Sequence, residues 1–173
     1  MFFDPQRFPF TASLQQHWRE IFREYSAVRD RAVDWVEREL YGDGWKVYGL
    51  FDFPHGQALA ENARLCPVTA GLVERHVPRH GAAGFSILRP GTRIQPHKGY
   101  QGEYLRCHLG LRVPAGDCAL QVAGATRRWR EGEVLVFDDR VEHAAWNETG
   151  EERVVLLIDF VPENGTPAAA GKW

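Results

Sequence analysis

Residues 84–114 read GFSILRPGTRIQPHKGYQGEYLRCHLGLRVP and contain three short apolar runs. Turn residues separate these runs, first at Pro90 and Gly91 and then around Gly99 and Gly102. Apolar runs of five to nine residues bounded by Gly and Pro are typical of β-strands joined by turns. The stretch therefore predicts strands near 84–88, 92–97 and 104–112.

The same alternation of short apolar runs and turns continues toward the C-terminus. It predicts five more strands, near 118–123, 126–130, 133–137, 142–147 and 152–161. Eight short antiparallel strands with no helix between them are typical of a jelly-roll or cupin-like barrel. We therefore expect a β-barrel over residues 81–162.

The first eighty residues have a different pattern. From Leu14 to Leu40 apolar residues recur at steps of three and four, which predicts an amphipathic helix with a break near Ser26. Residues 45–53 are rich in β-formers, and 67–77 predict a shorter helix. The expected fold class is thus mainly β with N-terminal helices.

Length and composition set the broad class of protein. A chain of 173 residues favours one domain, 1–173, made of a helical support (1–80), the barrel (81–162) and a flexible tail (163–173). The net charge of −2 argues against binding to nucleic acid or to an anionic membrane surface. No apolar run is long enough to span a membrane, and we see no signal peptide. Three cysteines without a CxxC pattern predict reduced thiols and a cytoplasmic protein.

Histidine is the residue type that most strongly suggests chemistry here. Four of the seven histidines lie in the helical half and are expected to be solvated or to cap helices: His17, His55, His76 and His80. The other three lie on predicted strands, where period-two counting lets all of them point into the barrel: His97, His108 and His143.

His97 begins a motif that resembles an iron site. Non-haem iron oxygenases commonly bind the metal with H-x-D/E and a distant His. Here the motif is His97-Lys98-Gly99, so glycine stands where the carboxylate would be, and His143 follows 46 residues after His97. The spacing alone is weak evidence for a metal site and favours two structural histidines in a barrel.

Basic residues near these histidines suggest an anion site. Arg106 and His108 alternate on one strand and face the same way, and Arg153 begins the last strand. Ser86 on the first barrel strand can add a hydroxyl donor. Buried arginines need compensating anions, and a guanidinium binds a carboxylate through two parallel hydrogen bonds. A dicarboxylate such as 2-oxoglutarate fits this pattern.

Three stretches together resemble the aspartyl/asparaginyl β-hydroxylase family. They are residues 84–114 quoted above, WREGEVLVFDDRVEHAAWN at 129–147, and RVVLLID at 153–159. The resemblance extends over about 82–162. It implies a double-stranded β-helix that uses iron(II), dioxygen and 2-oxoglutarate, with iron held by two histidines and no carboxylate.

The resemblance also implies roles for individual residues. His97 and His143 would be the iron ligands, with Gly99 marking the open ligand position. Arg153 and Ser86 would hold the distal carboxylate of 2-oxoglutarate, and Arg106 and His108 would line the inner face near the co-substrate or substrate. Asp138 or Asp139, in a predicted turn, would support a water at the open position.

Residues that flank these motifs have other expected roles. We expect Lys98, Tyr100 and Tyr104 to face the substrate. Trp129 and Trp146 are interpreted mainly as packing residues, and Cys107 should point to the face opposite Arg106 and His108.

The expected function is hydroxylation of an unactivated C–H bond, as in β-hydroxylation of an Asp- or Asn-like residue, a peptide or a small molecule. Two alternatives stay open. One is a 2-oxoglutarate-dependent halogenase, in which chloride binds at the slot left by Gly99. The other is a non-catalytic, cupin-like module that binds a carboxylate without turnover.

Overall fold

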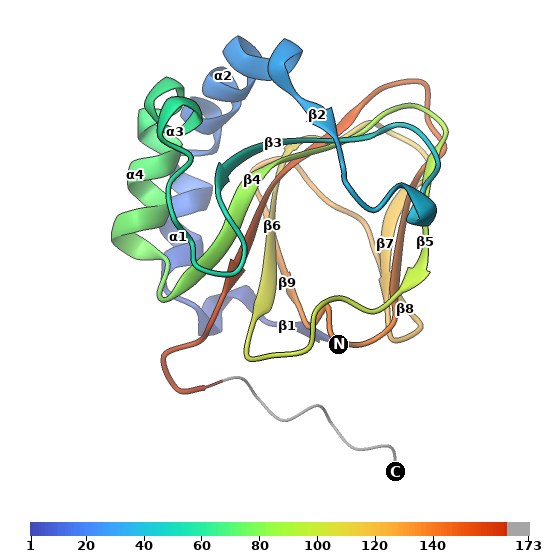
Figure 1. The fold of residues 1–173 in the computed structure, drawn as a ribbon. Helices are drawn as coiled ribbons and strands as arrows, with labels where there is room; N and C mark the ends of the chain where they lie inside the picture. The colour runs from blue at the N-terminus through green and yellow to red at the C-terminus, as the bar shows by residue number, and fades with distance from the viewer. Residues whose placement is uncertain (166–173) are drawn as a thin grey trace.

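The computed structural model describes residues 1–165. Residues 166–173, most of the flexible tail predicted at 163–173, lie outside the described residues. Its strands form two sheets, and within each sheet all neighbouring strands are antiparallel. The larger sheet has the order β1-β9-β6-β11-β4-β3-β2, and the smaller has the order β5-β10-β7-β8. Helices lie on one side of the larger sheet, and the smaller sheet faces its other side (Figure 1).

The strands expected in the barrel are all present. They are β4 (His80–Leu88), β5 (Thr92–His97), β6 (Leu105–Arg112), β7 (Cys118–Val122), β8 (Ala125–Arg127), β9 (Val134–Phe137), β10 (His143–Asn147) and β11 (Arg153–Phe160). The predicted mainly β, jelly-roll class is confirmed. The alternation of apolar residues and the turn residues were sufficient to predict these strands, because each strand is bounded by its own turn.

The N-terminal half contributes to the sheet as well as covering it. Three strands come from this half: β1 (Phe2–Phe3), β2 (Val33–Asp34) and β3 (Trp45–Phe51). The helices are α1 (Phe10–Gln16), α2 (Trp18–Val28), α3 (Ala60–Leu65) and α4 (Pro67–His76), with short 3₁₀ turns at Pro5–Arg7, Arg29–Arg31 and Arg38–Leu40. The predicted strand at 45–53 and helix at 67–77 correspond to β3 and α4.

The predicted helix over 14–40 is wrong beyond Val28. Residues 33–34 pair with β3, and the Trp35 ring stacks on Trp45 with centroids 4.5 Å apart. Val33 and Val36, which continued the helical pattern in the sequence, are 63% and 85% exposed. Pairing at the sheet edge and aromatic stacking here override a local helical periodicity.

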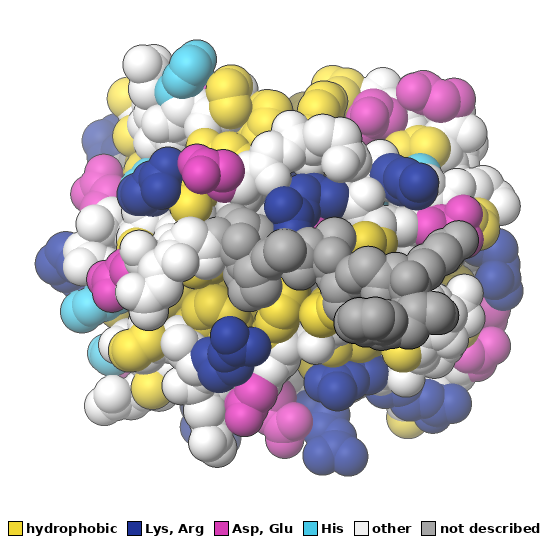
Figure 2. Space-filling model, turned by 90° about the horizontal axis from the view of Figure 1, so that it is seen from below, with side chains coloured by type: hydrophobic (Ala, Val, Ile, Leu, Met, Phe, Trp, Pro, Cys, Tyr) yellow, Lys and Arg dark blue, Asp and Glu magenta, His cyan; other side chains and the backbone are white. Residues whose placement is uncertain are grey.

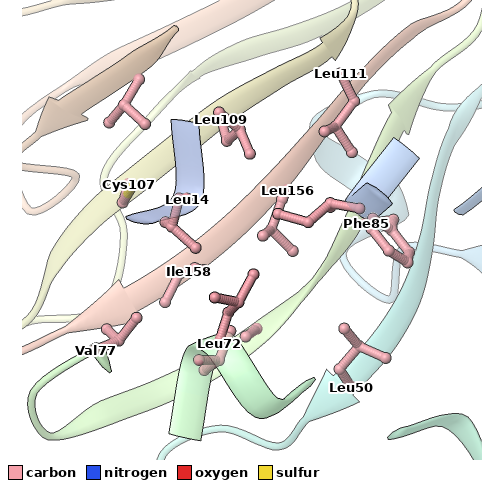
Figure 3. Close-up of a cluster of buried hydrophobic side chains, with 14 of the residues drawn as sticks. Leu14, Leu50, Leu72, Val77, Phe85, Cys107, Leu109, Leu111, Leu156 and Ile158 are labelled. Carbon is pink, nitrogen blue, oxygen red and sulfur yellow. The ribbon is translucent and has the colours of Figure 1, made fainter. Parts of the chain in front are cut away.

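Side chains of the larger sheet alternate between two apolar cores. One core packs the helices on the sheet, and Figure 3 shows Leu14 and Leu72 from the helices near Leu156 and Ile158 of the sheet. Cys107 lies in this core, as predicted, and all three cysteines are free and buried. The second core lies between the two sheets and includes Trp45, Leu120, Trp129, Phe137 and Val155.

The surface carries mixed charge. On the face shown in Figure 2, basic and acidic side chains are interspersed. Within residues 1–165, no helix has the length and apolar character needed to cross a membrane.

Candidate active site

Six residues predicted to form the site line one cavity between the two sheets. They come from five strands: Ser86 on β4, His97 on β5, Arg106 and His108 on β6, His143 on β10, and Arg153 on β11. Apolar side chains complete the wall, namely Trp45, Ile94, Leu120, Phe137, Ala145 and Leu157. The fold therefore gathers these six polar residues from across 68 positions of sequence, Ser86 to Arg153 inclusive.

His97 and His143 are paired directly across the β5–β10 ladder. Their ring centroids are 4.2 Å apart. The Nδ1 atom of each ring bonds to the backbone carbonyl two residues earlier, Gln95 O at 2.8 Å and Val141 O at 3.0 Å. Because a carbonyl only accepts, both Nδ1 atoms carry hydrogen, and both Nε2 atoms keep a lone pair for a metal.

Burial keeps His143 in the form that binds metal. Its pKa is lowered to about 4, chiefly by burial, which outweighs the hydrogen bond to Val141. A neutral imidazole whose other nitrogen is fixed by a carbonyl is the usual arrangement of a metal-binding histidine. The two rings fit a divalent transition metal on these grounds.

Gly99 stands where a carboxylate ligand would otherwise be, and its surroundings exclude a side chain. A Cβ atom at this position would lie 2.8 Å from Asp139 Cγ and 3.0 Å from Asp139 O. The Gly99 N–H donates to that same carbonyl, at 2.7 Å. In the part of the chain that the structure describes, no group of three His, Cys, Asp or Glu residues could hold a metal. Within these residues, His97 and His143 are the two candidate metal ligands that lie next to each other in the cavity.

Arg106 is neutralised from within the protein. Its guanidinium donates to both carboxylate oxygens of Asp159, at 2.7 and 3.0 Å, and Asp139 Oδ2 lies 3.2 Å from its Nη2. Burial disfavours the charge on Arg106, but the two carboxylates outweigh this effect and raise its pKa. Arg106 thus lines the cavity without being the uncompensated cation that the sequence suggested.

Asp159 was missed in the sequence, although a signal was present. It lies six residues after Arg153, so alternation places both on the same face of β11; it lines the pocket next to the cavity and is paired with Arg106 in the strand register. Counting by twos along RVVLLID would have placed Asp159 on the same face of the strand as Arg153.

Arg153 is the uncompensated cation of the cavity. The residue is 1% exposed, and its Nε and Nη1 atoms have no hydrogen-bond partner among residues 1–165. Burial lowers its pKa to about 10. The cavity also contains a third unpartnered buried atom, His108 Nε2. Unpaired buried donors are costly unless a ligand satisfies them, so these atoms favour an anion in the cavity.

Two tryptophans hold the polar residues of the cavity in place. Trp45 donates from Nε1 to Ser86 Oγ at 3.0 Å, which leaves the Ser86 hydroxyl hydrogen available. Trp129 donates to His108 Nδ1 at 3.2 Å, and the Arg153 guanidinium lies 4.5 Å from its ring centroid. Trp129 was expected to pack, and it does so at 3% exposure, but these two polar contacts were not foreseen.

The three residues expected to face the substrate lie outside this cavity. Tyr100 and Tyr104 line a neighbouring pocket with Phe53, on whose ring Tyr100 stacks at 4.8 Å. The Tyr104 hydroxyl donates to Pro54 O at 2.6 Å. Lys98 is exposed and borders a second opening beside His97. Arg106 lines the cavity and both openings, so the two openings adjoin the cavity, and the substrate role of Lys98, Tyr100 and Tyr104 stays a prediction.

The two facing antiparallel sheets form a double-stranded β-helix, and the cavity with its two histidines lies between them. Among solved structures, a prolyl-4-hydroxylase of Pseudomonas putida is similar in fold, with a TM-score of 0.55 and 16% identity over 88% of each chain. The sequence pattern of the aspartyl/asparaginyl β-hydroxylases matches residues 15–162. The chain belongs to this family, which confirms the resemblance seen in the sequence.

Two relatives show how this chain compares in length. The ornithine lipid ester-linked acyl 2-hydroxylase of Rhizobium tropici is 34% identical over 99% of this chain and 64% of its own length. The human aspartyl/asparaginyl beta-hydroxylase is 32% identical over 90% of this chain and 21% of its own. The chain thus spans just under two thirds of the first and about a fifth of the second.

Proposed function

We propose that this protein is an iron(II)- and 2-oxoglutarate-dependent hydroxylase. One observation carries the proposal: two imidazoles with free Nε2 lone pairs share a cavity with three unpartnered, buried donor atoms on Arg153 and His108. A metal and an anionic co-substrate together would satisfy both sets of atoms.

His97 and His143 would hold the metal. Imidazole nitrogen suits divalent iron, and the two rings leave most of the coordination sphere to other ligands. Iron(II), when bound, would supply the activation of dioxygen by which 2-oxoglutarate becomes succinate and carbon dioxide while a substrate C–H becomes C–OH.

The protein's own residues would bind and orient the co-substrate. Arg153 offers two N–H donors to a carboxylate, and Ser86 can add a hydroxyl donor from the adjacent strand β4. The apolar wall of Ile94, Leu120 and Leu157 would exclude water from this end of the cavity. Charge-assisted hydrogen bonds are strongest in such a dry setting.

The substrate would approach through the openings on the other side of Arg106. There Asp139 and Asp159 compensate the Arg106 guanidinium, so Arg106 has no free charge for an acidic substrate, and Lys98 is the exposed cation at one opening. Phe53, Tyr100 and Tyr104 make the rim aromatic. We therefore extend the substrate class from Asp- or Asn-like residues and peptides to acyl groups, the kind of substrate named for the Rhizobium tropici relative.

The two alternatives are less well supported. A chloride at the slot beside Gly99 would lie close to the Asp139 carboxylate, and like charges repel. A binding module without turnover would have no use for two histidines with free Nε2 atoms. Both alternatives are distinguished by the experiment that follows.

The test is conversion of 2-oxoglutarate to succinate with iron(II) and ascorbate, first alone and then with pooled amino acids, peptides and acyl compounds. Turnover in the wild-type protein that is lost in His143→Ala supports the proposal. Arg153→Lys should raise the KM for 2-oxoglutarate, since an ammonium cannot form the paired hydrogen bonds. Absence of turnover combined with absence of metal-dependent 2-oxoglutarate binding in calorimetry would sink it, and a chlorinated product would favour the halogenase.

A further inference from the structure

Trp129 contacts two residues of the cavity through two different parts of its side chain. Its indole Nε1 donates to His108 Nδ1 at 3.2 Å. The face of its ring lies against the guanidinium of Arg153, with Cζ 4.5 Å from the ring centroid. Trp129 itself follows β8 and belongs to the apolar core between the sheets.

The indole hydrogen bond determines which nitrogen of His108 carries hydrogen. An indole N–H can only donate, so His108 Nδ1 must accept. The hydrogen of the neutral imidazole then resides on Nε2. Burial and the nearby Arg153 lower the pKa of His108 well below its ordinary value, which agrees with a neutral ring.

With this tautomer, the unpartnered buried atoms of the cavity are all hydrogen-bond donors. The buried side-chain atoms without a partner in the described residues are His108 Nε2, Arg153 Nε and Arg153 Nη1. With His108 in the Nε2–H form, all three are donors. Both residues line the same cavity, and the only ligand that satisfies donors alone is an acceptor, such as a carboxylate.

We propose that Trp129 is a positioning residue for the co-substrate carboxylate: its N–H selects the donor tautomer of His108, and its ring face holds the Arg153 guanidinium. The inference rests on the proposed function for the identity of the anion. The selection of the tautomer does not depend on that identity. The competing interpretation is that Trp129 only fills space between the sheets.

The decisive variant is Trp129→Phe, which keeps an aromatic face for Arg153 but removes the N–H. Its matched control is Trp146→Phe, because the Trp146 indole donates to Asp117 at 2.7 Å and lies outside the cavity. Thermal unfolding followed by circular dichroism checks that both variants fold.

The first measurement is the tautomer of His108 by NMR of the full chain labelled with ¹⁵N-histidine, with the signal assigned by its loss in His108→Gln. We expect the Nε2–H form in the wild-type protein and in Trp146→Phe, and a mixture of tautomers in Trp129→Phe. An Nδ1–H form in the wild-type protein overturns the proposal, whether or not Trp129→Phe folds. This result is independent of turnover, so it stands even if the protein proves not to be a hydroxylase.

The second measurement is the affinity for 2-oxoglutarate, by calorimetry on zinc-loaded protein and as KM in turnover. We expect Trp129→Phe to weaken binding about tenfold, the loss of roughly one hydrogen bond, with kcat within about twofold of wild type. The same substitution in a His108→Gln background should have little further effect, because an amide donor needs no tautomer selection. An equal loss in both backgrounds, or unchanged affinity in Trp129→Phe, would show that Trp129 acts only by packing.

Discussion

His97 and His143 face each other across one antiparallel strand pair, with ring centroids 4.2 Å apart. Directly opposed residues in such a pair have Cβ atoms only about 5 Å apart, so two strands suffice to bring two imidazoles to one metal. Each ring is oriented by the carbonyl two residues before it. The pair is thus prearranged by strand pairing and by two backbone carbonyls.

The first prediction concerns this pair. His97→Ala and His143→Ala should each abolish metal-dependent turnover, because a single imidazole cannot hold the metal in a site that lacks a carboxylate ligand. Metal content after dialysis, measured by atomic emission, checks whether turnover is lost because the metal is lost. His76→Ala is the control, since His76 is exposed at the end of α4 and lines neither the cavity nor its two openings. Full turnover in either active-site variant would contradict the assignment.

The second prediction concerns the space at Gly99. Gly99→Ala should destabilise the fold by about 1–3 kcal/mol, because the new Cβ atom would meet the Asp139 carbonyl as well as its side chain. Urea unfolding measures the change. Gly102→Ala is the matched control, since a Cβ atom there meets nothing within 4 Å. Equal stabilities of the two variants would show that Asp139 does not restrict this position.

The third prediction concerns the buried ion pair. Arg106→Met should cost about 3–5 kcal/mol of unfolding free energy, because Asp159 is left buried without its partner. Arg79→Met removes an exposed pair with Glu103 and should cost less than about 1 kcal/mol. Chemical denaturation of both variants compares them. If Arg106→Met were as stable as Arg79→Met, the buried pair would contribute nothing.

The fourth prediction concerns acid stability. Burial alone raises the pKa of Asp138, but hydrogen bonds from the Arg140 side chain and backbone outweigh it, so the pKa lies below the ordinary value. Asp138 therefore stabilises the fold fully above its unfolded pKa, near 4, and this contribution disappears as the pH falls through its lower folded pKa. Asp138→Asn should lower stability at pH 7 and flatten its decline below pH 4. Urea unfolding from pH 3 to 7 measures both, and an unchanged slope would count against the prediction.

Much of the fold was accessible from local patterns. Turn residues around Pro90 and Gly99 delimited strands, and alternation by twos along 104–112 correctly placed Arg106 and His108 on one face and Cys107 on the other. The failure came at 33–40, where a local helical period was overridden by pairing with β3 and by the stacking of Trp35 on Trp45.

The sequence by itself determined which side chains enter the barrel, because strand alternation is a property of neighbouring residues. Only the tertiary structure decided which of them meet. The register sets His143 opposite His97 and Asp159 opposite Arg106, and it depends on the packing of whole sheets. In the same way, the contact between Trp129 and His108 spans 21 residues and two structural elements, and no local pattern encodes such a distance.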